Sequence, residues 1–400
     1  MRILQLAHKT YPYSQGGVEI YTYALSRELI RRGHQVAIAA SIKQTGISTD
    51  VPLYPLATRA KGYLRSPSRA DQKKNWQSFK KIIDEFTPDI IHVQHLLEMG
   101  WETLERLQDL NIPFVLSLHD FFYLCPGINW MCRGNVFECA KNCLKPYRGK
   151  GYFLRLCRAC WETLCYRSRY INLFNKMKAP ILANSKTTAS IYEQNGLMKG
   201  KVTVHALGID ISGITSEASN SDGHTFPRFG FIGGTREEKG LTYLMEAFQN
   251  LNIAHELHVW GVDSPQSSIE KKITATVKKS IFYHEEFNHA VLNQVLRTFD
   301  ILVVPSVCEE TYNLAIQEGL AAKKVVIASA VGGIKERIIS GVNGFLIPPR
   351  DPQALAVCMQ YVAENLISLK QKLDFSSAVQ DIRIDGEWLE NFYNQTIIFF

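Results

Sequence analysis

Strand-like and helical segments alternate along the chain, and the alternation restarts once. RILQLA reads as a strand, followed by a turn at Gly16 and Gly17, an amphipathic helix from about Val18 to Arg32 and the strand QVAIAA. Further strand-like runs are DIIHV, PFVLSLH and PILANS, and the pattern begins again at RFGFIGG, with the helix LTYLMEAFQNL and the strand HELHVWG. This alternation predicts two successive α/β halves built on parallel sheets.

A polar segment separates the two halves. Residues 211–227 are rich in Ser, Gly, Thr and Asp, which is typical of a linker. We therefore expect one domain over residues 1–208 and a second over 209–375. Residues 376–400 include a helical stretch with apolar side chains at helical spacing, which predicts a helix that packs back on the body: Trp388, Leu389, Phe392 and Tyr393.

Composition narrows the class of protein. The chain has 400 residues, of which 46% are hydrophobic and 21% charged, as in an ordinary water-soluble globular protein. No apolar run reaches the roughly 18 to 20 residues that span a bilayer, so we expect a cytoplasmic protein. The net charge of +7 suits phosphates or an anionic membrane surface. A nucleic-acid partner is not expected, because neither half carries an RNA- or DNA-binding signature.

Two carboxylates stand eight residues apart in VVPSVCEETYNLAIQEGLAAKKVVIAS. The flanking VVPS and VVIAS read as buried parallel strands, and NLAIQEGLAAKK reads as a helix capped by Asn313, with Lys323 and Lys324 at its cationic end. Glu310 then lies on the loop at the carboxyl end of a strand, and Glu318 lies one to two turns into the helix. Open α/β sheets bind their ligands at that edge.

A nucleotide-sugar fits this arrangement. The amides at the helix N-terminus would suit a diphosphate, and a carboxylate on either side would accept hydrogen bonds from hydroxyl groups. These amides belong to Tyr312, Asn313 and Leu314. The alternative is that Glu310 and Glu318 are solvated surface acids.

Three further features are ambiguous when taken singly. Gly16 and Gly17 could admit a phosphate to backbone amides or could form an ordinary turn. Lys239, in IGGTREEKG, could neutralise a leaving diphosphate or could be a surface lysine. His119, after the strand PFVLSL, could donate to a substrate oxygen or cap its strand. Neither GxGxxG nor GxxxxGK[ST] occurs, which argues against a dinucleotide dehydrogenase and a P-loop NTPase.

The motifs together resemble those of GT-B retaining glycosyltransferases of the family 4 type, over almost the full length. The similar segments, in the family's order, are GGVEIYTYALSRELIRRGHQVAI, the strand ending LHD, GGTREEKGLTYLMEAF and EETYNLAIQEGLAAKKVVIASAVGGIKERIISGVNGFLIPPRDP. The resemblance implies two Rossmann-like domains that face each other across a cleft. It also implies that the amino-terminal domain holds the acceptor and the other domain the nucleotide-sugar.

The resemblance also assigns roles to residues. Glu310 would face the transferred sugar near its anomeric centre, and Glu318 would hold the nucleotide ribose. The catalytic set would be His119, Glu310 and Lys239, with His119 contacting the sugar and Lys239 binding the diphosphate. The glycine loop of Gly16 and Gly17 would close over the donor.

The chain departs from the family pattern at two places. The family usually has Gly-Arg before its lysine motif, whereas this chain has Gly233 and Gly234. The diphosphate-binding arginine is therefore missing unless Arg236 reaches the same place. In AAKKVV, Lys323 and Val325 replace the usual glycine and proline.

An insert over about residues 125–178 is rich in cysteine, cationic and aromatic residues. It either binds a structural zinc or forms a helical hairpin with reduced thiols, the zinc ligands being four of Cys132, Cys139, Cys143, Cys157 and Cys160. Its basic and aromatic character suits an anionic membrane interface. The basic residues expected to meet lipid headgroups are Arg155, Arg158, Arg167 and Arg169.

We therefore predict a retaining glycosyltransferase that needs no cofactor for catalysis. It would act on a glycan or lipid-linked glycan in surface polysaccharide synthesis, peripherally at the inner face of the membrane. The alternatives are another GT-B enzyme on sugar nucleotides, such as an epimerase, and a sugar-nucleotide-binding protein that has lost turnover. The identity of the sugar, the nucleotide and the acceptor does not follow from the sequence.

Overall fold

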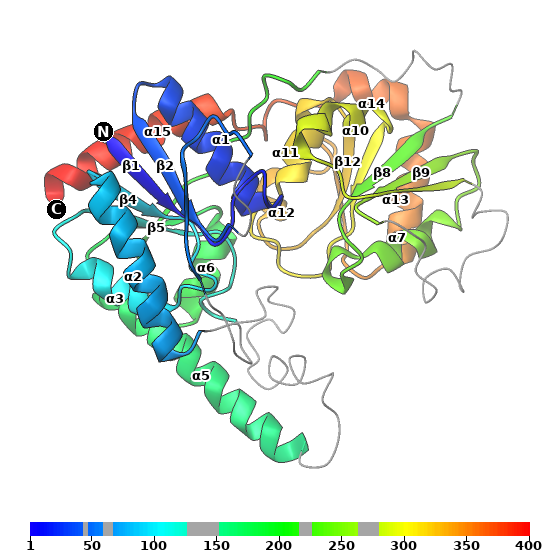
Figure 1. Cartoon of the computed structure of the whole chain (residues 1–400). Helices are drawn as coiled ribbons and strands as arrows, with labels where there is room; N and C mark the ends of the chain where they lie inside the picture. Colours follow the sequence, from blue (N-terminus) through cyan, green and yellow to red (C-terminus); the bar gives the residue numbers. More distant parts are fainter. Residues whose placement is uncertain (43–46, 59–66, 126–151, 216–225, 263–279) are drawn as a thin grey trace. The chain divides into compact units, whose positions relative to one another are not determined.

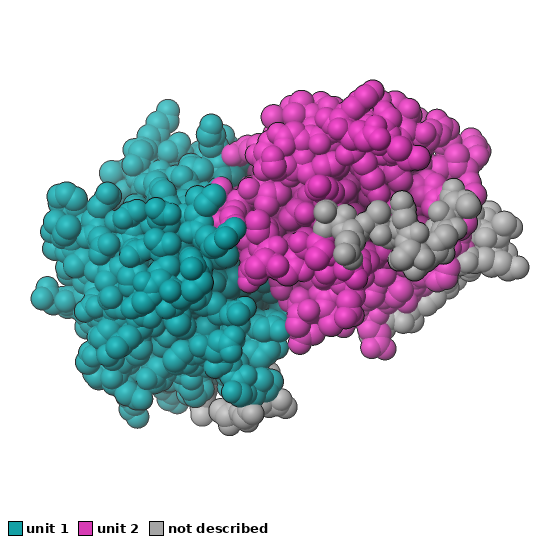
Figure 2. Space-filling view, turned by 90° about the horizontal axis from the view of Figure 1, so that it is seen from above, with its two compact units in different colours: residues 1–208, 382–400 teal, residues 209–381 magenta. Residues whose placement is uncertain are grey.

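The structure is a computed structural model that describes residues 1–42, 47–58, 67–125, 152–215, 226–262 and 280–400, without the side chains of 152–159. The chain forms two compact units. Unit 1 comprises Met1–Gly208 and Ile382–Phe400, and unit 2 comprises Ile209–Asp381, as the two colours of Figure 2 show.

Unit 1 is built on a parallel sheet with strand order β3-β2-β1-β4-β5-β6-β7. The strands are β1 (Arg2–Leu6), β2 (Gln35–Ala40), β3 (Leu53–Pro55), β4 (Ile90–Val93), β5 (Phe114–Leu118), β6 (Ile181–Ala183) and β7 (Val202–Val204). The helices that accompany them are α1 (Gly17–Arg31), α2 (Arg69–Phe86), α3 (Trp101–Gln108), α5 (Tyr152–Lys176) and α6 (Lys186–Gln194) (Figure 1).

Unit 2 repeats the design with strand order β10-β9-β8-β11-β12-β13, again parallel. The strands are β8 (Arg228–Ile232), β9 (Glu256–Trp260), β10 (Ile281–His284), β11 (Ile301–Val304), β12 (Val325–Ser329) and β13 (Phe345–Ile347). The helices are η3 (Glu237–Lys239), α7 (Leu241–Phe248), η4 (His289–Val291), α10 (Leu292–Arg297), α11 (Leu314–Ala321), α12 (Ile334–Arg337), α13 (Pro352–Glu364) and α14 (Leu366–Lys372). Both sheets confirm the predicted α/β class with two Rossmann-like halves.

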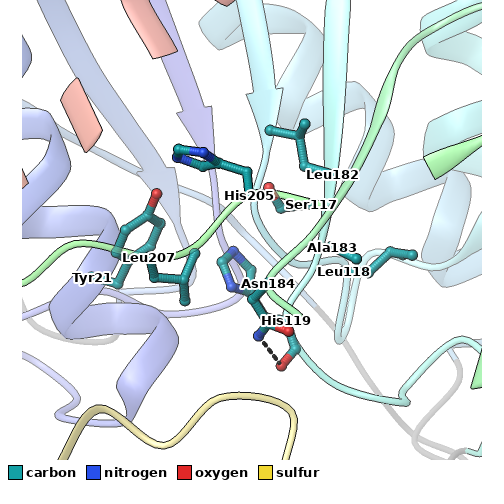
Figure 3. A pocket seen from close by; sticks show the side chains of 9 residues that line it. All are labelled: Tyr21, Ser117, Leu118, His119, Leu182, Ala183, Asn184, His205 and Leu207. Carbon is teal, nitrogen blue, oxygen red and sulfur yellow. Dashed lines mark hydrogen bonds between the residues drawn. The ribbon is translucent and has the colours of Figure 1, made fainter. Parts of the chain in front are cut away.

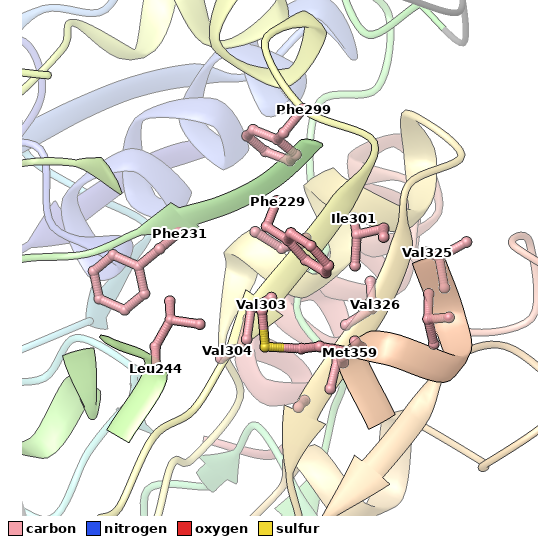
Figure 4. Packing of buried hydrophobic residues seen from close by; sticks show 14 of the residues in the cluster. Phe229, Phe231, Leu244, Phe299, Ile301, Val303, Val304, Val325, Val326 and Met359 are labelled. Atoms are coloured by element: carbon pink, nitrogen blue, oxygen red, sulfur yellow. The ribbon is translucent and has the colours of Figure 1, made fainter. Parts of the chain in front are cut away.

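The core of unit 2 explains why its central strands read as unbroken apolar runs. β8, β11 and β12 lie side by side and are covered on both faces, so that Phe229, Ile301 and Val325 are each fully buried and share one row of the sheet. Met359 of α13 packs against the same cluster (Figure 4). Strands buried on both faces cannot alternate polar and apolar residues.

The last helix, α15 (Ile382–Phe399), belongs to unit 1 and packs against α1. Leu389 and Tyr393 are fully buried, and the Trp388 ring stacks on His205 with centroids 3.8 Å apart. The carboxylate of Asp385 accepts hydrogen bonds from His205 (2.6 Å) and from the amide of Gly208 (2.7 Å). The chain therefore re-enters unit 1 next to Gly208, the residue at which it left that unit.

Part of the predicted cysteine-rich insert lies outside the described residues. This applies to Cys132, Cys139 and Cys143 and to the side chain of Cys157, so the zinc site stays a prediction. In the described part of the chain, no cluster of three potential metal ligands occurs. No described helix has the length and hydropathy needed to cross a membrane.

Two basic residues of α5 make contacts within the protein. The side chains of Arg155 and Arg158 are not described. The Arg167 guanidinium donates to the carbonyl of Leu124 (3.2 Å) and to Asn195 Oδ1 (2.9 Å). The expectation that Arg167 meets lipid headgroups is therefore wrong, because its donors fasten α5 to unit 1. Arg169 is exposed and lies over the ring of Trp101, 4.4 Å from the centroid.

Candidate active site

A partly buried ion pair lies at the carboxyl ends of β8 and β11 in unit 2. Lys239 Nζ donates to Glu310 Oε1 at 2.9 Å, and Ser306 Oγ donates to the same oxygen at 2.7 Å. The charge of Glu310 raises the pKa of Lys239. Burial would raise the pKa of Glu310, but the charge and hydrogen bond of Lys239 lower it below its usual value. Both groups are therefore charged at neutral pH.

Gly240 allows Lys239 to reach this position. Lys239 ends the short helix η3, just before α7. Gly240 has φ +74°, and a Cβ there would lie 1.9 Å from the carbonyl oxygen of Pro305. Only glycine allows that approach, so the η3 turn lies against the end of β11, from which the Glu310 loop begins.

The loop after β12 fixes the backbone of Glu310. The amide of Gly333 donates to the Glu310 carbonyl at 2.7 Å, and the amide of Gly332 donates to Glu309 Oε2 at 2.7 Å. Gly332 has φ +50°, and a Cβ on it would meet the Glu310 carbonyl oxygen at 1.9 Å. The Glu310 loop is thus held from the neighbouring strand as well as by its own side chain.

The structure confirms Asn313 as the cap of α11. Its side chain accepts from the amide of Ile316 at 3.3 Å, with the backbone at φ +71°. Tyr312 is buried, and Leu314 is the first residue of the helix. The dipole of α11 therefore begins beside the Glu310 loop, where its positive end suits an anion.

Glu318 lies further along α11 and is paired with His289, which no motif in the sequence singled out. Its Oε1 accepts from His289 Nε2 at 2.9 Å, and Glu318 is 6% exposed. Burial lowers the pKa of His289, but the hydrogen bond and charge of Glu318 outweigh this and raise it above its usual value. A hydroxyl that binds Glu318 would share the carboxylate with His289.

Arg236 does not join the Lys239 and Glu310 pair. Its guanidinium pairs with Glu238 at 3.2 Å, and its side chain is 64% exposed. A long exposed side chain can change rotamer at little cost. The proposed role of Arg236 in binding the diphosphate therefore stays a prediction.

In unit 1, polar side chains gather where β5, β6 and β7 end. His119, Asn184 and His205 line a pocket together with Tyr21 and Ser117 (Figure 3). The Asn184 amide donates to the carbonyl oxygen of His119 at 3.3 Å. Burial lowers the pKa of His119 to about 3, so the imidazole is neutral at physiological pH. His119 therefore does more than cap its strand, because its ring forms part of a polar pocket.

A buried hydrogen-bond chain fixes the tautomer of His119. Gln94 donates through Nε2 to Gln5 Oε1 (2.9 Å) and His92 Nδ1 (3.1 Å), which leaves its Oε1 to accept from His119 Nε2 at 2.6 Å. His92 Nδ1 also lies 2.5 Å from the hydroxyl of Tyr393 on α15. The proton of neutral His119 thus resides on Nε2, and Nδ1 can act only as a hydrogen-bond acceptor.

Gly16 caps α1 and Gly17 is its first residue. The φ of Gly16 is −72°, so the turn itself does not require glycine. A Cβ there would meet the buried Glu19 carboxylate, at 2.3 Å from Oε2. Ser14 Oγ donates to the other oxygen of Glu19 at 2.9 Å, so this carboxylate is held in place. Glycine at position 16 therefore leaves room for the Glu19 carboxylate against the backbone of this loop.

The predicted site residues form one set in each unit. Lys239, Glu310 and Asn313 meet in unit 2, with Glu318 on the same helix, whereas His119 and the Gly16 loop belong to unit 1. The partners Gln94, His289 and Ser306 were missed. Ser306 lies only four residues before Glu310, so this contact is local. Gln94 and His289 meet their partners through long-range packing, which no short segment reveals.

Comparison with known proteins agrees with this architecture. Residues 15–212 match the family model described as Glycosyltransferase Family 4, and residues 226–365 match Glycosyl transferases group 1. An uncharacterized glycosyltransferase of Methanocaldococcus jannaschii is 26% identical over 281 residues, covering 69% of this chain and 66% of the relative.

Two solved structures share the whole fold. HepE of Anabaena, in complex with UDP and glucose, aligns with a TM-score of 0.69 at 16% identity, over 99% of this chain and all of the other. WaaG, a glycosyltransferase involved in lipopolysaccharide biosynthesis, aligns with a TM-score of 0.68 at 13% identity, over 98% and 99% of the two chains.

The two parallel-sheet units and the matching family models define a glycosyltransferase of the GT-B class. Within that class, the chain belongs to the family 4 glycosyltransferases, whose carboxyl-terminal half is the group 1 module.

Proposed function

We propose that this glycosyltransferase moves a sugar from a nucleotide-sugar to a glycan acceptor with retention of anomeric configuration. The observation that carries the proposal is the partly buried Lys239 and Glu310 pair beside the capped start of α11, with Glu318 on the same helix. Lys239 and the α11 amides would bind the diphosphate, with one carboxylate on each side. The UDP and glucose bound to HepE support a donor of this class.

The chemistry would depend on charge that develops on the departing diphosphate. Lys239 and the α11 amides would stabilise that charge, which is the largest catalytic term in comparable sites. We propose that these groups do so without a metal ion. His119 Nδ1 would accept a hydrogen bond from a sugar hydroxyl, because Gln94 holds the ring proton on Nε2.

A screen of nucleotide-sugars by thermal shift tests the donor, because a ligand that binds the folded state raises the melting temperature. Turnover of the best ligand, followed by NMR of the product's anomeric proton, then tests the reaction in the presence and absence of EDTA. A glycoside with the donor's configuration is expected. Free sugar as the main product would favour an epimerase-like enzyme, and binding without turnover would favour an inactive binding protein.

We further propose that the acceptor is lipid-linked and that α5 meets the inner membrane surface. On the described part of α5, Trp161 is 69% exposed and Leu164 is 45% exposed, with Arg169 on the exposed surface of the same helix. Apolar and cationic groups on one exposed helix suit an anionic interface. The role of WaaG in lipopolysaccharide biosynthesis supports an acceptor of this kind.

Liposome flotation with and without anionic lipid, at low and high salt, tests the attachment. Each basic residue near the surface should contribute roughly 1 kcal/mol, and salt should weaken binding. Trp161→Ser should reduce flotation, whereas Ile367→Ser on α14, another exposed apolar residue, should not. Indifference to both lipid charge and salt would favour an acceptor that is not membrane-bound.

A further inference from the structure

A cluster of cationic side chains lies at the amino ends of the unit 2 strands, at the sheet edge opposite the Lys239 and Glu310 pair. Arg228 begins β8, Asp300 precedes β11 and Lys324 precedes β12. The register pairs Ile301 with Phe229 on one side and with Val325 on the other. Arg228, Asp300 and Lys324 therefore occupy one row across three adjacent strands, about 4.8 Å apart from strand to strand.

The Asp300 carboxylate in this row is already engaged. Lys370 Nζ of α14 donates to Asp300 Oδ1 at 3.1 Å. The backbone amide of Arg228 donates to Asp300 Oδ2 at 3.3 Å, and Arg228 Nε lies 3.8 Å from that oxygen. Arg297, at the end of α10, adds a further positive charge that acts on Lys324. Four cationic side chains thus lie around Asp300, and Glu256 of β9 continues the row on the other side of Arg228.

Two of the four cationic residues are deeply buried. Arg228 is 4% exposed, and its Nε finds no hydrogen-bond partner among the described residues. Lys324 is 3% exposed, and the charges of Lys370, Asp300, Arg228 and Arg297 act on its ammonium. A buried donor without a partner, such as Arg228 Nε, is costly, and its presence in a folded protein points to an unseen water or ion.

Lys324 was expected at the solvated end of a helix, and the structure corrects that expectation. α11 ends at Ala321, Lys323 turns the chain with φ +54° and remains exposed, and Lys324 is directed into the protein. Burial, followed by the charge of Lys370, lowers the pKa of Lys324 to about 8. Asp300 opposes this shift, while Arg228 and Arg297 add to it. The ammonium is held charged at a cost that a nearby anion would remove.

We propose that this cluster is a binding site for a phosphate dianion, held by Lys324 and Arg228 with Lys370 and Arg297 at its rim. With Lys324 protonated, four positive charges face the two negative charges of Asp300 and Glu256, so a group carrying two negative charges fits better than chloride. The ligand is either inorganic phosphate or the phosphomonoester of a small metabolite. The site is separate from the donor site, because it lies at the other end of the same strands.

Isothermal titration calorimetry of the full chain with inorganic phosphate, at constant ionic strength, tests the proposal. Lys324→Met should weaken binding at least about tenfold, and it should still fold, because replacing a buried charge with an apolar side chain of similar volume is often neutral or stabilising. Lys323→Met, the exposed neighbour, is the matched control and should bind as the wild type does. Affinity should fall as the pH rises through 8, because Lys324 then loses its proton.

Lys239→Met separates this site from the donor site. Phosphate binding that survives Lys239→Met and is lost in Lys324→Met supports the proposal. Binding that is lost in Lys239→Met and kept in Lys324→Met would overturn it, as would the absence of any binding to the wild type. A hexose phosphate that binds more tightly than inorganic phosphate identifies a metabolite ligand, and equal affinities identify the free ion. Each of these two results supports the site.

Discussion

Replacing Lys239 with methionine should separate the structural and catalytic roles of the partly buried pair. Methionine keeps most of the volume of the side chain and removes its charge. Lys239 Nζ lies 2.9 Å from Glu310 Oε1, and the two side chains are 27% and 12% exposed. Loss of one partner of a fully buried pair costs about 3 to 5 kcal/mol of the unfolding free energy. Glu310 keeps the Ser306 hydrogen bond and some solvent, so we expect roughly 1 to 3 kcal/mol.

The effect on turnover should be larger. A group that stabilises developing negative charge contributes about 2 to 4 kcal/mol to the transition state. Each 1.36 kcal/mol is tenfold in rate, so kcat should fall by about 30- to 1000-fold. The measurements are initial rates with the donor identified by thermal shift, and urea unfolding followed by fluorescence. Lys323→Met is the control for loss of an exposed positive charge in the same unit.

The pH dependence gives the same substitution a second readout. Lys239 holds the pKa of Glu310 below its usual value against the opposing effect of burial. In the wild type, ionised Glu310 therefore stabilises the fold at any pH above its pKa in the unfolded chain. This contribution is lost as the pH falls through the lower pKa of Glu310 in the folded protein. Without Lys239, burial dominates and the Glu310 pKa rises. Protonation of Glu310 on acidification then relieves the buried charge, so the stability deficit of Lys239→Met relative to the wild type should shrink as the pH falls.

The double variant Lys239→Met/Glu310→Gln tests the structural role. Removing the orphaned carboxylate should recover much of the stability, whereas kcat should stay low because both proposed catalytic groups are then absent. Regained activity in the double variant would refute the catalytic roles of both residues. A kcat within threefold of the wild type in Lys239→Met would refute the catalytic role outright.

Three further outcomes are expected. Glu318→Ala should mainly raise the dissociation constant of the donor, whereas Glu310→Gln should mainly lower kcat; equal and near-neutral effects on both constants would remove the donor-site interpretation. Gln94→Met should leave the fold intact but release the Nε2 proton of His119, which should lower kcat by about tenfold or more. Gln94→Asn should lower kcat in the same way, because its side chain is one methylene too short to reach His119. NMR of the imidazole nitrogens reports the tautomer directly, and an unchanged tautomer in Gln94→Met would contradict this role. Metal analysis of the purified protein should give one zinc per chain, lost when Cys157 and Cys160 become serine, whereas no zinc in the wild type would leave the insert as a hairpin with reduced thiols.

Much of unit 2 around Glu310 could be predicted from local sequence. ILVV and VVIAS are strands because β-branched runs suit a sheet covered on both faces, and the first of them ends before the Pro305 and Ser306 of VVPS. Asn313 caps α11 because its side chain can satisfy a free amide. These are short-range effects, since each depends on a few neighbouring residues. The sheet edge on which Glu310 lies could be predicted as well, because parallel strands have their carboxyl ends at the same edge.

The pairing of side chains was decided by the tertiary structure. Lys239 and Glu310 are 71 residues apart and meet only because β8 neighbours β11 and Gly240 allows the η3 turn to approach Pro305. Gln94 reaches His119 for the same reason in unit 1, and Lys324 is buried rather than solvated because the turn at Lys323 directs it under the sheet. The sequence determined which segments are strands and helices and what chemistry their ends carry. Partners, burial and proton positions depend on strand order and long-range packing, which no local pattern encodes.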